Sequence, residues 1–369
     1  MDGRPTLQSV ADRASVSRQT VSNVLNAPHL VRPETLDRVR SVIDEVGYRP
    51  HGAARQLRTR RSQVIGLRLQ PSADGVNGAV LDRFMHALTE QAQVRGYRIM
   101  LFTAPDDHGE IAQYSELLDT LELDAFVLTS THRGDARTRW LADRGVPFVT
   151  FGRPWDPPDG DGDGTDAVAS RHAWVDVDGA HGTRTAVEHL QGLGHSRIAF
   201  LGWPVGSDVG DDRRAGWRRA MRASGVADHE LDALDVGVED GVANGGQAAR
   251  RLMDLLAPTA FVCASDSLAL GALAATRSVT GSGPGSTIDG AVGVAPAVIG
   301  FDDTPVARAV GLSSVAQPLT EAAGQALALL LDQLSGQRPG DEPPLDLPDD
   351  RHVLLCPSLA IRSSSRIHG

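Results

Sequence analysis

The sequence of 369 residues contains no lysine, only two cysteines and 4% aromatic residues, and these shortages exclude several classes of protein. Without lysine the phosphate loop G-x-x-x-x-G-K-[ST] cannot occur, and the G-x-S-x-G, C-x-x-C and H-E-x-x-H motifs are also missing. Cys263 and Cys356 cannot form a disulfide framework and fit a reducing compartment. No run approaches eighteen apolar residues, and no apolar signal segment stands at the N-terminus. We therefore expect a cytoplasmic protein, not an enzyme, with no membrane partner.

Two patterns imitate metal sites without completing them. The start of a calcium loop is matched by Asp159, Asp161, Asp163 and Gly164. Ser170, however, stands where such a loop requires a bidentate glutamate, so we interpret the segment as a solvated acidic loop. Spacings of eight and six, which fit no metal motif, separate His181, His189 and His195. No metal and no cofactor is expected.

All 36 basic residues are arginines, and they are unevenly distributed. Residues 1–61 hold 11 of them against 6 of the 47 acidic residues, a net charge of +5. The rest of the chain holds 25 arginines against 41 acids, a net charge of −16. A small basic segment on an acidic protein predicts a polyanion partner for that segment, with a solvated patch as the alternative.

Three short amphipathic helices are predicted between residues 6 and 46. The residues expected on their buried faces recur at helical spacing, and they are Leu7, Val10, Ala11 and Ala14, then Thr20, Val21, Val24 and Leu25, then Leu36, Val39, Val42, Ile43 and Val46. Only Ser15 and Val16 separate the first two helices, which is typical of a helix-turn-helix whose second helix enters the DNA major groove. The outward face of that second helix carries Arg18 and Gln19, residue types that read guanine and adenine.

The segments TLQSVADRASVSRQTVSNVLN and RPETLDRVRSVIDEVGYRPHGAARQLRT resemble the DNA-binding head of the LacI/GalR transcriptional repressors. The resemblance implies base readout by Arg18, Gln19 and Asn23. It also implies DNA positioning, chiefly through phosphates, by Thr6, Ser17, Thr20, Ser22, Asn26 and Tyr48. The sequence departs from the family at Ser15, where a glycine is usual, and at Arg32, where a capping serine is common. We expect Ser15 to adopt a left-handed conformation at some cost.

Residues 51–61 correspond in this family to a hinge helix that pairs with a second copy in the DNA minor groove. The resemblance implies minor-groove contacts by Ala54, Arg55, Leu57 and Arg58. Leu57 stands where the family places an apolar wedge that kinks the duplex. The alternative, in the absence of DNA, is a flexible linker.

From Val64 onward strands and helices alternate, which predicts parallel, doubly wound α/β sheets. Strands are expected at 64–69, 98–103, 125–129, 147–151, 197–202, 259–264 and 297–301. Helices are expected at 78–95, 109–121, 134–144, 179–193, 213–224, 245–256 and 266–276. The stretches AVEHLQGLGHSRIAFLGW, PTAFVCASDSLALGALAA and VIGFDDTPVA resemble the LacI/GalR effector domain, which has the fold of type I periplasmic binding proteins.

The resulting fold class is α/β, with an all-α helix-turn-helix head and a hinge helix before two doubly wound subdomains. We assign the head to residues 1–50, the hinge to 51–61, the effector and dimerisation domain to 62–362, and a tail to 363–369. Within that domain the N-subdomain is expected at 62–177 and 318–348, and the C-subdomain at 178–317 and 349–362. Ligands of such sheets bind at the carboxyl ends of the strands, here in the cleft between subdomains.

The resemblance places effector-binding residues at Arg213, Ser265, Asp266, Asp302 and Gln317. Arg213 would grip hydroxyls or carboxylates, and Asp302 would accept hydrogen bonds from hydroxyls. For Asp266 a helix N-cap is an equal alternative. The aromatic ring that some sugar-responsive members place near Asp240 is missing, since the stretch reads Glu239-Asp240-Gly241-Val242. The effector is expected to be a sugar or another polar metabolite, and its identity stays open.

These observations predict a sequence-specific, nucleoid-associated transcriptional regulator, expected to be a repressor, that binds a near-palindromic double-stranded operator as a homodimer. A small molecule in the cleft would control operator affinity. The alternatives are an activator, a regulator of the same family without an effector and, more remotely, a solute-binding protein, against which the basic head argues.

Overall fold

The computed structural model describes residues 5–48, 61–70, 78–155, 172–280, 295–336 and 351–366. The chain divides into two units, Met1–Ser62 and Gln63–Gly369, and each is described by itself. The predicted hinge residues Ala54, Arg55, Leu57 and Arg58 lie outside the described residues, as does the acidic loop with Asp159, Asp161, Asp163, Gly164 and Ser170.

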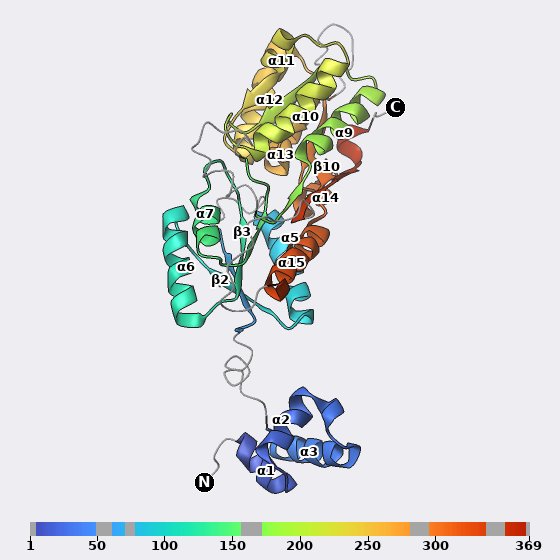
Figure 1. The fold of residues 1–369 in the computed structure, drawn as a ribbon. Coiled ribbons are helices and arrows are strands. Elements are labelled where there is room, and N and C mark those ends of the chain that lie inside the picture. The colour runs from blue at the N-terminus through green and yellow to red at the C-terminus, as the bar shows by residue number, and fades with distance from the viewer. Residues whose placement is uncertain are drawn as a thin grey trace. The chain divides into compact units, whose positions relative to one another are not determined.

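The first unit is a bundle of three α-helices, drawn in blue in Figure 1: α1 (Leu7–Ala14), α2 (Arg18–Asn26) and α3 (Pro33–Val46), with a 3-10 turn at Pro28–Leu30. The predicted apolar faces meet in one core, whose buried members are Val10, Ala11, Ala14, Val21, Val24, Val39, Val42 and Tyr48. The helical periodicity of the sequence therefore predicted this core.

Local capping defines where these helices begin and end. Thr6 and Ser9 form a reciprocal capping box at the start of α1, and Ser17 accepts a hydrogen bond from the amide of Thr20 at the start of α2. Ser15 ends α1 in the left-handed conformation (φ 52°), as predicted. Arg32 makes no side-chain cap, and α3 instead begins with proline at its first position.

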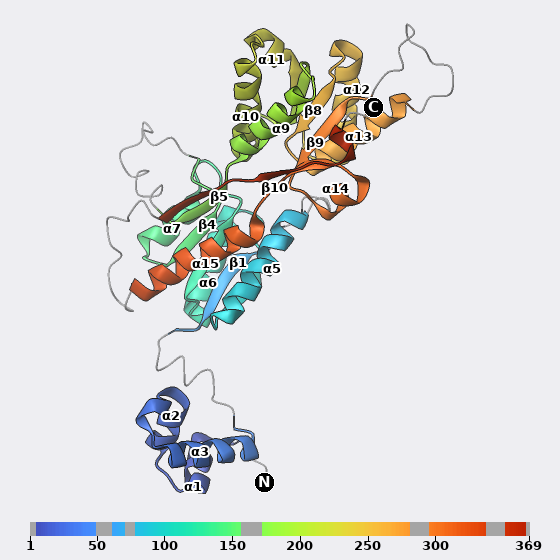
Figure 2. The same ribbon diagram turned by 90° about the vertical axis from the view of Figure 1, so that its right-hand side faces the viewer.

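The second unit contains two six-stranded sheets (Figures 1 and 2). The first sheet is wholly parallel in the order β11-β5-β4-β3-β1-β2. Its strands are β1 (Val64–Arg68), β2 (Arg98–Phe102), β3 (Ala125–Thr129), β4 (Phe148–Phe151), β5 (Trp174–Val177) and β11 (His352–Leu355). We call this sheet with its helices the first subdomain.

Two helix layers cover the first sheet because its central strands are apolar on both faces. On one face Ala125 and Val127 pack with α5 (Gly78–Val94) and α15 (Leu319–Gly336), which lie side by side (Figure 2). On the other face Phe126 and Leu128 pack with α6 (Asp107–Leu121) and α7 (Ala136–Asp143).

The second sheet has the order β12-β10-β9-β8-β6-β7, in which only β12 runs antiparallel to its neighbour. Its strands are β6 (Ile198–Gly202), β7 (Asp235–Gly237), β8 (Ala260–Cys263), β9 (Ala297–Phe301), β10 (Ser313–Ala316) and β12 (Ser358–Ala360). Its helices are α9 (Gly179–Gly192), α10 (Val209–Ala223), α11 (Asp228–Leu234), α12 (Val242–Leu256), α13 (Asp266–Thr280) and α14 (Pro305–Val310). Together they form the second subdomain.

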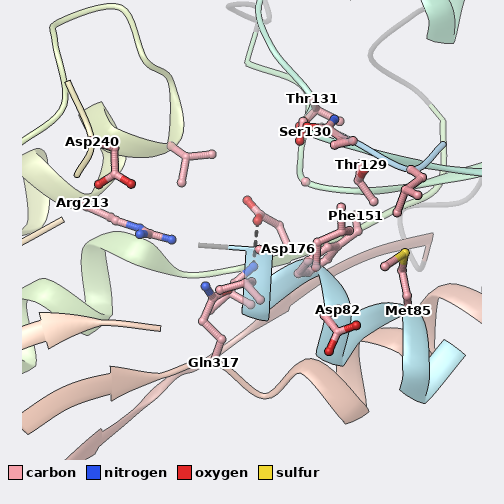
Figure 3. Close-up of a pocket in the computed structure, with 18 residues that line it drawn as sticks. Asp82, Met85, Thr129, Ser130, Thr131, Phe151, Asp176, Arg213, Asp240 and Gln317 are labelled. Atoms are coloured by element: carbon pink, nitrogen blue, oxygen red, sulfur yellow. Dashed lines mark hydrogen bonds between the residues drawn. The ribbon is translucent and has the colours of Figure 1, made fainter. Parts of the chain in front are cut away.

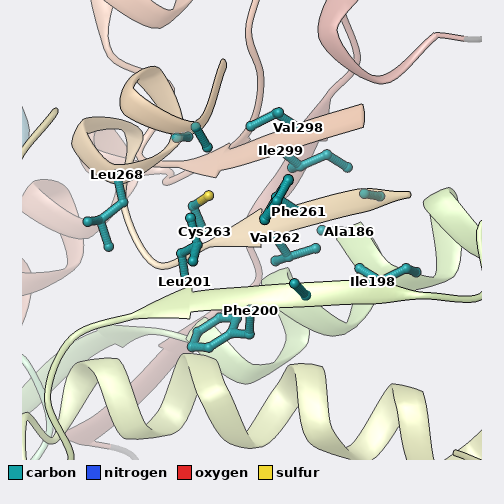
Figure 4. Packing of buried hydrophobic residues seen from close by; sticks show 14 of the residues in the cluster. Ala186, Ile198, Phe200, Leu201, Phe261, Val262, Cys263, Leu268, Val298 and Ile299 are labelled. Atoms are coloured by element: carbon teal, nitrogen blue, oxygen red, sulfur yellow. The ribbon is translucent and has the colours of Figure 1, made fainter. Parts of the chain in front are cut away.

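The core of the second subdomain is continuous through β6, β8 and β9, where Phe200, Phe261 and Ile299 are fully buried (Figure 4). The helix pairs α9–α10 and α12–α13 flank the sheet (Figure 2). Glycine permits both close helix contacts. A Cβ at Gly216 would lie 2.1 Å from the carbonyl oxygen of Ala180, and one at Gly271 would lie 2.0 Å from that of Val242.

The chain crosses between the subdomains three times, after β5, after β10 and after β11. The last crossover corrects two predicted boundaries. Residues 349–362 are not all in the second subdomain, because β11 pairs with β5 of the first sheet. Nor is the described part of 363–369 a separate tail: Ser364 Oγ donates to the carbonyl of Val298 at 2.6 Å, and Ser365 and Ser313 hydroxyls lie 2.6 Å apart.

The predicted strands and long helices of this unit are present with shifts of a few residues at their ends. The structure adds elements that were not predicted, including β5, β7 and α11. These three elements are four, three and seven residues long, too short for periodicity to identify them. The eighteen-residue helix α15 was also not among the predicted helices.

Candidate functional site

The second helix of the head presents its predicted base-reading residues on one polar face. Arg18 and Gln19 are exposed and Asn23 is half-buried. Gln19 Nε2 donates to Asn23 Oδ1 at 3.0 Å, so these two amides, one helical turn apart, orient each other. Arg18 makes no ion pair with any described residue, and its guanidinium is available to a partner.

The residues expected to position DNA fall into three kinds of place. Ser17 and Thr20 are at the N-terminus of α2, with their hydroxyl oxygens 2.9 Å apart. Asn26 Nδ2 donates to the carbonyl oxygen of Ser22 at 2.7 Å near the other end of the helix. Thr6 is exposed and caps α1. Tyr48 instead packs into the core and is only 7% exposed, so little of its side chain could reach a phosphate.

A cavity of 610 Å³ lies where the carboxyl ends of strands from both subdomains approach each other (Figure 3). Arg213 and Asp240 of the second subdomain face it from one side, and Thr129, Ser130 and Phe151 of the first from the other. The complete lining among the described residues is Leu69, Gln70, Gly78, Val80, Leu81, Asp82, Met85, Thr129, Ser130, Thr131, Phe151, Gly152, Asp176, Val177, Val209, Arg213, Asp240 and Gln317. Its volume lies within the range of about 300–1,000 Å³ of small-molecule sites.

Arg213 reaches this cavity from α10 and is 6% exposed. One terminal nitrogen donates to the carbonyl oxygen of Ala264, and the guanidinium stacks 3.7 Å above the ring centre of Phe301. Burial lowers the pKa of Arg213, and the carboxylates of Asp302 and Asp176 oppose that shift. Its Nε has no hydrogen-bond partner among the described residues, which leaves a buried donor beside the cavity.

Asp302 lies behind the cavity wall and not on it, which differs from the direct contact expected from the sequence. Its carboxylate accepts a hydrogen bond of 2.6 Å from Gln317 and lies 3.6 Å from Arg213, both of which line the cavity. Burial raises the pKa of Asp302 to about 7, although the charge of Arg213 works against that rise. Asp302 thus holds two lining side chains in place.

Ser265 and Asp266 also stand behind the wall. Ser265, not Asp266, caps α13, since Ser265 Oγ accepts from the amide of Leu268 at 3.2 Å. Asp266 is fully buried and accepts hydrogen bonds from the amide of Thr304 (2.7 Å) and the hydroxyl of Ser314 (2.6 Å). The N-cap interpretation of Asp266 is therefore wrong by one residue, and Asp266 joins three elements of the second subdomain.

Sequence reasoning missed several lining residues. Asp240, noted only for the ring that is missing beside it, accepts hydrogen bonds from Trp203 Nε1 at 3.0 Å and from the Ser265 hydroxyl. Phe151 and Thr129 end strands of the first sheet, and Asp176 lies in β5. The rule that ligands bind at the carboxyl ends of parallel strands could have identified Phe151 and Thr129 from the predicted strands.

A buried ionic network supports the wall formed by residues 129–131. Arg137 is 1% exposed and donates to Glu110 (2.9 Å), to Asp135 (2.7 Å) and to the carbonyl oxygens of Thr129 and Ser130. Glu110 in turn accepts hydrogen bonds from Arg68 (2.7 Å) and from the hydroxyl of Tyr114 (2.6 Å). One buried glutamate therefore links the end of β1 to the loop after β3.

One group of side chains among the described residues has the spacing of a metal site, and it consists of Asp107, His132 and Asp135. Asp135 already accepts hydrogen bonds at both carboxylate oxygens from Arg137. Arg137 also lies 3.6 Å from Asp107, so its positive charge occupies the place where a cation would bind. We assign no metal to this group.

Two different family profiles match the two units of the chain. A sequence profile described as "Bacterial regulatory proteins, lacI family" matches residues 6–51, and one described as "Periplasmic binding protein-like domain" matches 187–365. The HTH-type transcriptional regulator CelR of Thermobifida fusca is 33% identical over 346 residues, which cover 90% of this chain and 93% of CelR. The chain belongs to the LacI family of bacterial transcriptional regulators.

Solved structures agree with this assignment. A regulatory protein of the LacI family from Chloroflexus aggregans has a TM-score of 0.68 and 34% identity, with 82% of this chain and 98% of that chain covered. The transcriptional regulator CelR in its complex with cellobiose has a TM-score of 0.64 and 28% identity, with 98% and 100% covered. This LacI-family protein is a DNA-binding transcriptional regulator, and these relatives are regulators and not enzymes. Within the described parts of the chain, no helix has the length and apolarity needed to cross a membrane.

Proposed function

We propose that this LacI-family regulator binds a near-palindromic operator as a homodimer and represses transcription until a polar metabolite binds between its subdomains. It would act in the cytoplasm, where the DNA lies. The observation that carries effector control is the cavity lined by residues of both subdomains. A ligand that contacts both changes the free energy of their relative positions, which is the requirement for coupling to a distant DNA head.

The exposed face of α2 supports the assignment of DNA contacts. Arg18, Gln19 and Asn23 would read base edges, because their guanidinium and amide groups match guanine and adenine in the major groove. Phosphates and register would be held by Thr6, Ser17, Thr20, Ser22 and Asn26, with a smaller contribution from the largely buried Tyr48. Two heads on two half-sites account for a near-palindrome. The hinge would place Ala54, Arg55, Leu57 and Arg58 in the minor groove.

For the effector, we propose direct contacts from Arg213, Gln317 and Asp240. Asp302 and Ser265 would act through them, since Asp302 holds Arg213 and Gln317 and Ser265 holds Asp240. Asp266 would stabilise the second subdomain without touching the ligand. The cellobiose complex of CelR supports a carbohydrate as the effector class.

A site selection from random duplexes with the full-length protein tests this function, followed by titration of cellobiose into the complex with the selected duplex. We expect a preferred two-fold site bound by two chains, and a metabolite that changes its affinity by about 5–150-fold. Asp240→Asn should remove the metabolite response and leave DNA affinity unchanged, whereas Asp254→Asn, at an exposed position on α12, should change neither.

Two other results would redirect the assignment. Higher reporter expression when the operator is occupied would indicate an activator, and an operator affinity that no metabolite changes would indicate effector-independent regulation. If the protein shows no preference for any duplex but binds a solute, the result would indicate a solute-binding protein.

A further inference from the structure

Among the described residues that line the cavity, one is aromatic, and the orientation of its ring is fixed by a second ring packed against it. Phe151 is the last residue of β4, and Phe84 of α5 stacks on it with ring centres 4.3 Å apart and planes inclined by 6°. Phe84 is fully buried in the core of the first subdomain. Because Phe84 covers one face of Phe151, the surface that Phe151 offers to the cavity is its other face and its edge.

Apolar and polar side chains both surround this ring. Met85 of α5 lies on the same side of the cavity as Phe151, and so do the polar residues Asp82, Thr129 and Ser130 (Figure 3). Arg213, Asp240 and Gln317 approach from the second subdomain and the crossover (Figure 3). A pyranose ring also has both kinds of surface, a face of C–H groups and an edge of hydroxyls. Such a ring can bury its C–H face on Phe151 while its hydroxyls reach charged hydrogen-bond partners.

The charges that line the cavity favour an uncharged ligand. Among the described residues, the lining includes the carboxylates of Asp82, Asp176 and Asp240 and the guanidinium of Arg213. Asp176 is paired with Arg153, which leaves two carboxylates, those of Asp82 and Asp240, against Arg213. Carboxylates accept hydrogen bonds from hydroxyls but repel phosphate or carboxylate groups in a site of low dielectric.

Two buried polar groups beside the cavity lack partners among the described residues, which points to a hydrogen-bonding ligand. They are the hydroxyl of Thr129, a residue 4% exposed, and Nε of Arg213. Unpaired buried groups of this kind are costly unless something binds them.

We propose that Phe151, backed by Phe84, is the stacking platform for a neutral sugar ring, and that this cavity binds uncharged mono- or disaccharides and rejects phosphorylated sugars. The inference rests on the proposed function, because it assumes that the cavity is the effector site. Some sugar-responsive family members place an aromatic ring near the position of Asp240, in the second subdomain. In this protein that stretch has no ring, and the proposed aromatic contact lies in the first subdomain.

The test uses the full-length protein and isothermal titration calorimetry with glucose, galactose, maltose, cellobiose, glucose 6-phosphate and adenosine. We expect at least one neutral sugar to bind, and glucose 6-phosphate to bind at least tenfold more weakly than glucose. Phe151→Leu should weaken binding of that sugar about tenfold, whereas Leu88→Met, an apolar replacement in the buried core of the first subdomain and outside the described cavity lining, should change it less than threefold. Both variants should bind the selected duplex as the parent does, which shows that they fold.

Saturation-transfer difference NMR on the unaltered protein gives a second readout that does not depend on any variant. Irradiation of aromatic protons should saturate the C–H protons of one face of the bound sugar. Tighter binding of glucose 6-phosphate or adenosine than of every neutral sugar would overturn the inference, as would Phe151→Leu binding within twofold of the parent. Duplex binding without any neutral-sugar binding would refute the inference alone, and failure to select a duplex would refute the proposed function.

Discussion

Arg153 of the first subdomain donates a hydrogen bond of 3.2 Å to the carboxylate of Asp212 on α10 of the second. Arg153 also pairs with Asp176, a residue of the cavity lining. A second link runs from the amide of Arg133 to Asp208, at 2.9 Å. The two subdomains are therefore joined by ionic contacts beside the cavity as well as by the three crossovers.

The Arg153–Asp212 contact should carry measurable coupling energy because both side chains are largely buried, with 23% and 15% exposure. A double-mutant cycle with Arg153→Gln and Asp212→Asn should give an interaction free energy of about 1–3 kcal/mol in urea unfolding. The control pair Arg222–Asp228 lies 2.7 Å apart but is 50% and 69% exposed, so its cycle should give about 0–1 kcal/mol. Equal values for the two pairs would show that burial adds nothing to the link.

Base readout by α2 predicts different effects for two exposed arginines. Arg18→Ala should relax the sequence preference at one position of each half-site, with a loss of about 1–3 kcal/mol of discrimination. Arg38→Ala, on the exposed side of α3, should weaken binding to all sequences alike or leave it unchanged. Site selection with each variant measures this difference. An unchanged preference in the Arg18 variant would remove that residue from base readout.

Burial raises the pKa of Asp302 to about 7, and this makes folding depend on pH. The folded protein keeps a proton that the unfolded chain releases above its ordinary pKa of 3.8, so the stability contribution is complete below about pH 4 and is lost as the pH rises through about 7. In Asp302→Asn the fall in unfolding free energy between pH 5 and pH 8 should be smaller by about 1–3 kcal/mol. Asp266, whose pKa burial raises to about 6, should leave a residual slope at the lower pH.

Tryptophan fluorescence is suited to this measurement. All five tryptophans lie beyond residue 62, so their emission follows the second unit without a signal from the head. The same pH dependence in the variant and the parent would show that Asp302 is ionised throughout this range.

The buried network around Arg137 should be sensitive to the loss of its central charge. Arg137→Met leaves Glu110 and Asp135 without their shared partner and should lower the unfolding free energy by about 3–5 kcal/mol. Arg139→Met on the same helix removes an exposed arginine and should cost less than about 0.5 kcal/mol. Urea unfolding followed by fluorescence compares them. A similar small loss in both variants would contradict the central role of Arg137.

Local signals in the sequence were sufficient for the head. The core with Val10, Val21 and Val39 and the proline start of α3 follow from periodicity and capping within a few residues. The left-handed Ser15 was expected from the family resemblance, because a glycine is usual at that position. Tyr48 is the exception. Its burial depends on how the end of α3 folds back on the bundle, which no local pattern contains.

For the candidate cavity, the sequence predicted the location and some lining residues but not the role of every residue. Its position between the subdomains was predictable from the strand pattern, and the presence of Arg213 and Gln317 in its lining from the resemblance to the family, but the roles of Asp302 and Ser265 were not predictable. A carboxylate beside an arginine can face a ligand or hold the arginine from behind, and only the directions of the side chains decide between these.

The basic three-helix head and the alternation of strands and helices that leads to two parallel sheets could both be predicted from the sequence, because both depend on patterns among near neighbours. Two features became visible only in three dimensions: β11 joins the first sheet, and Phe151 faces Arg213 and Asp240 across a cavity. The residues involved lie far apart in the sequence and come together only in the folded protein. Their spacing along the chain therefore does not predict the contacts.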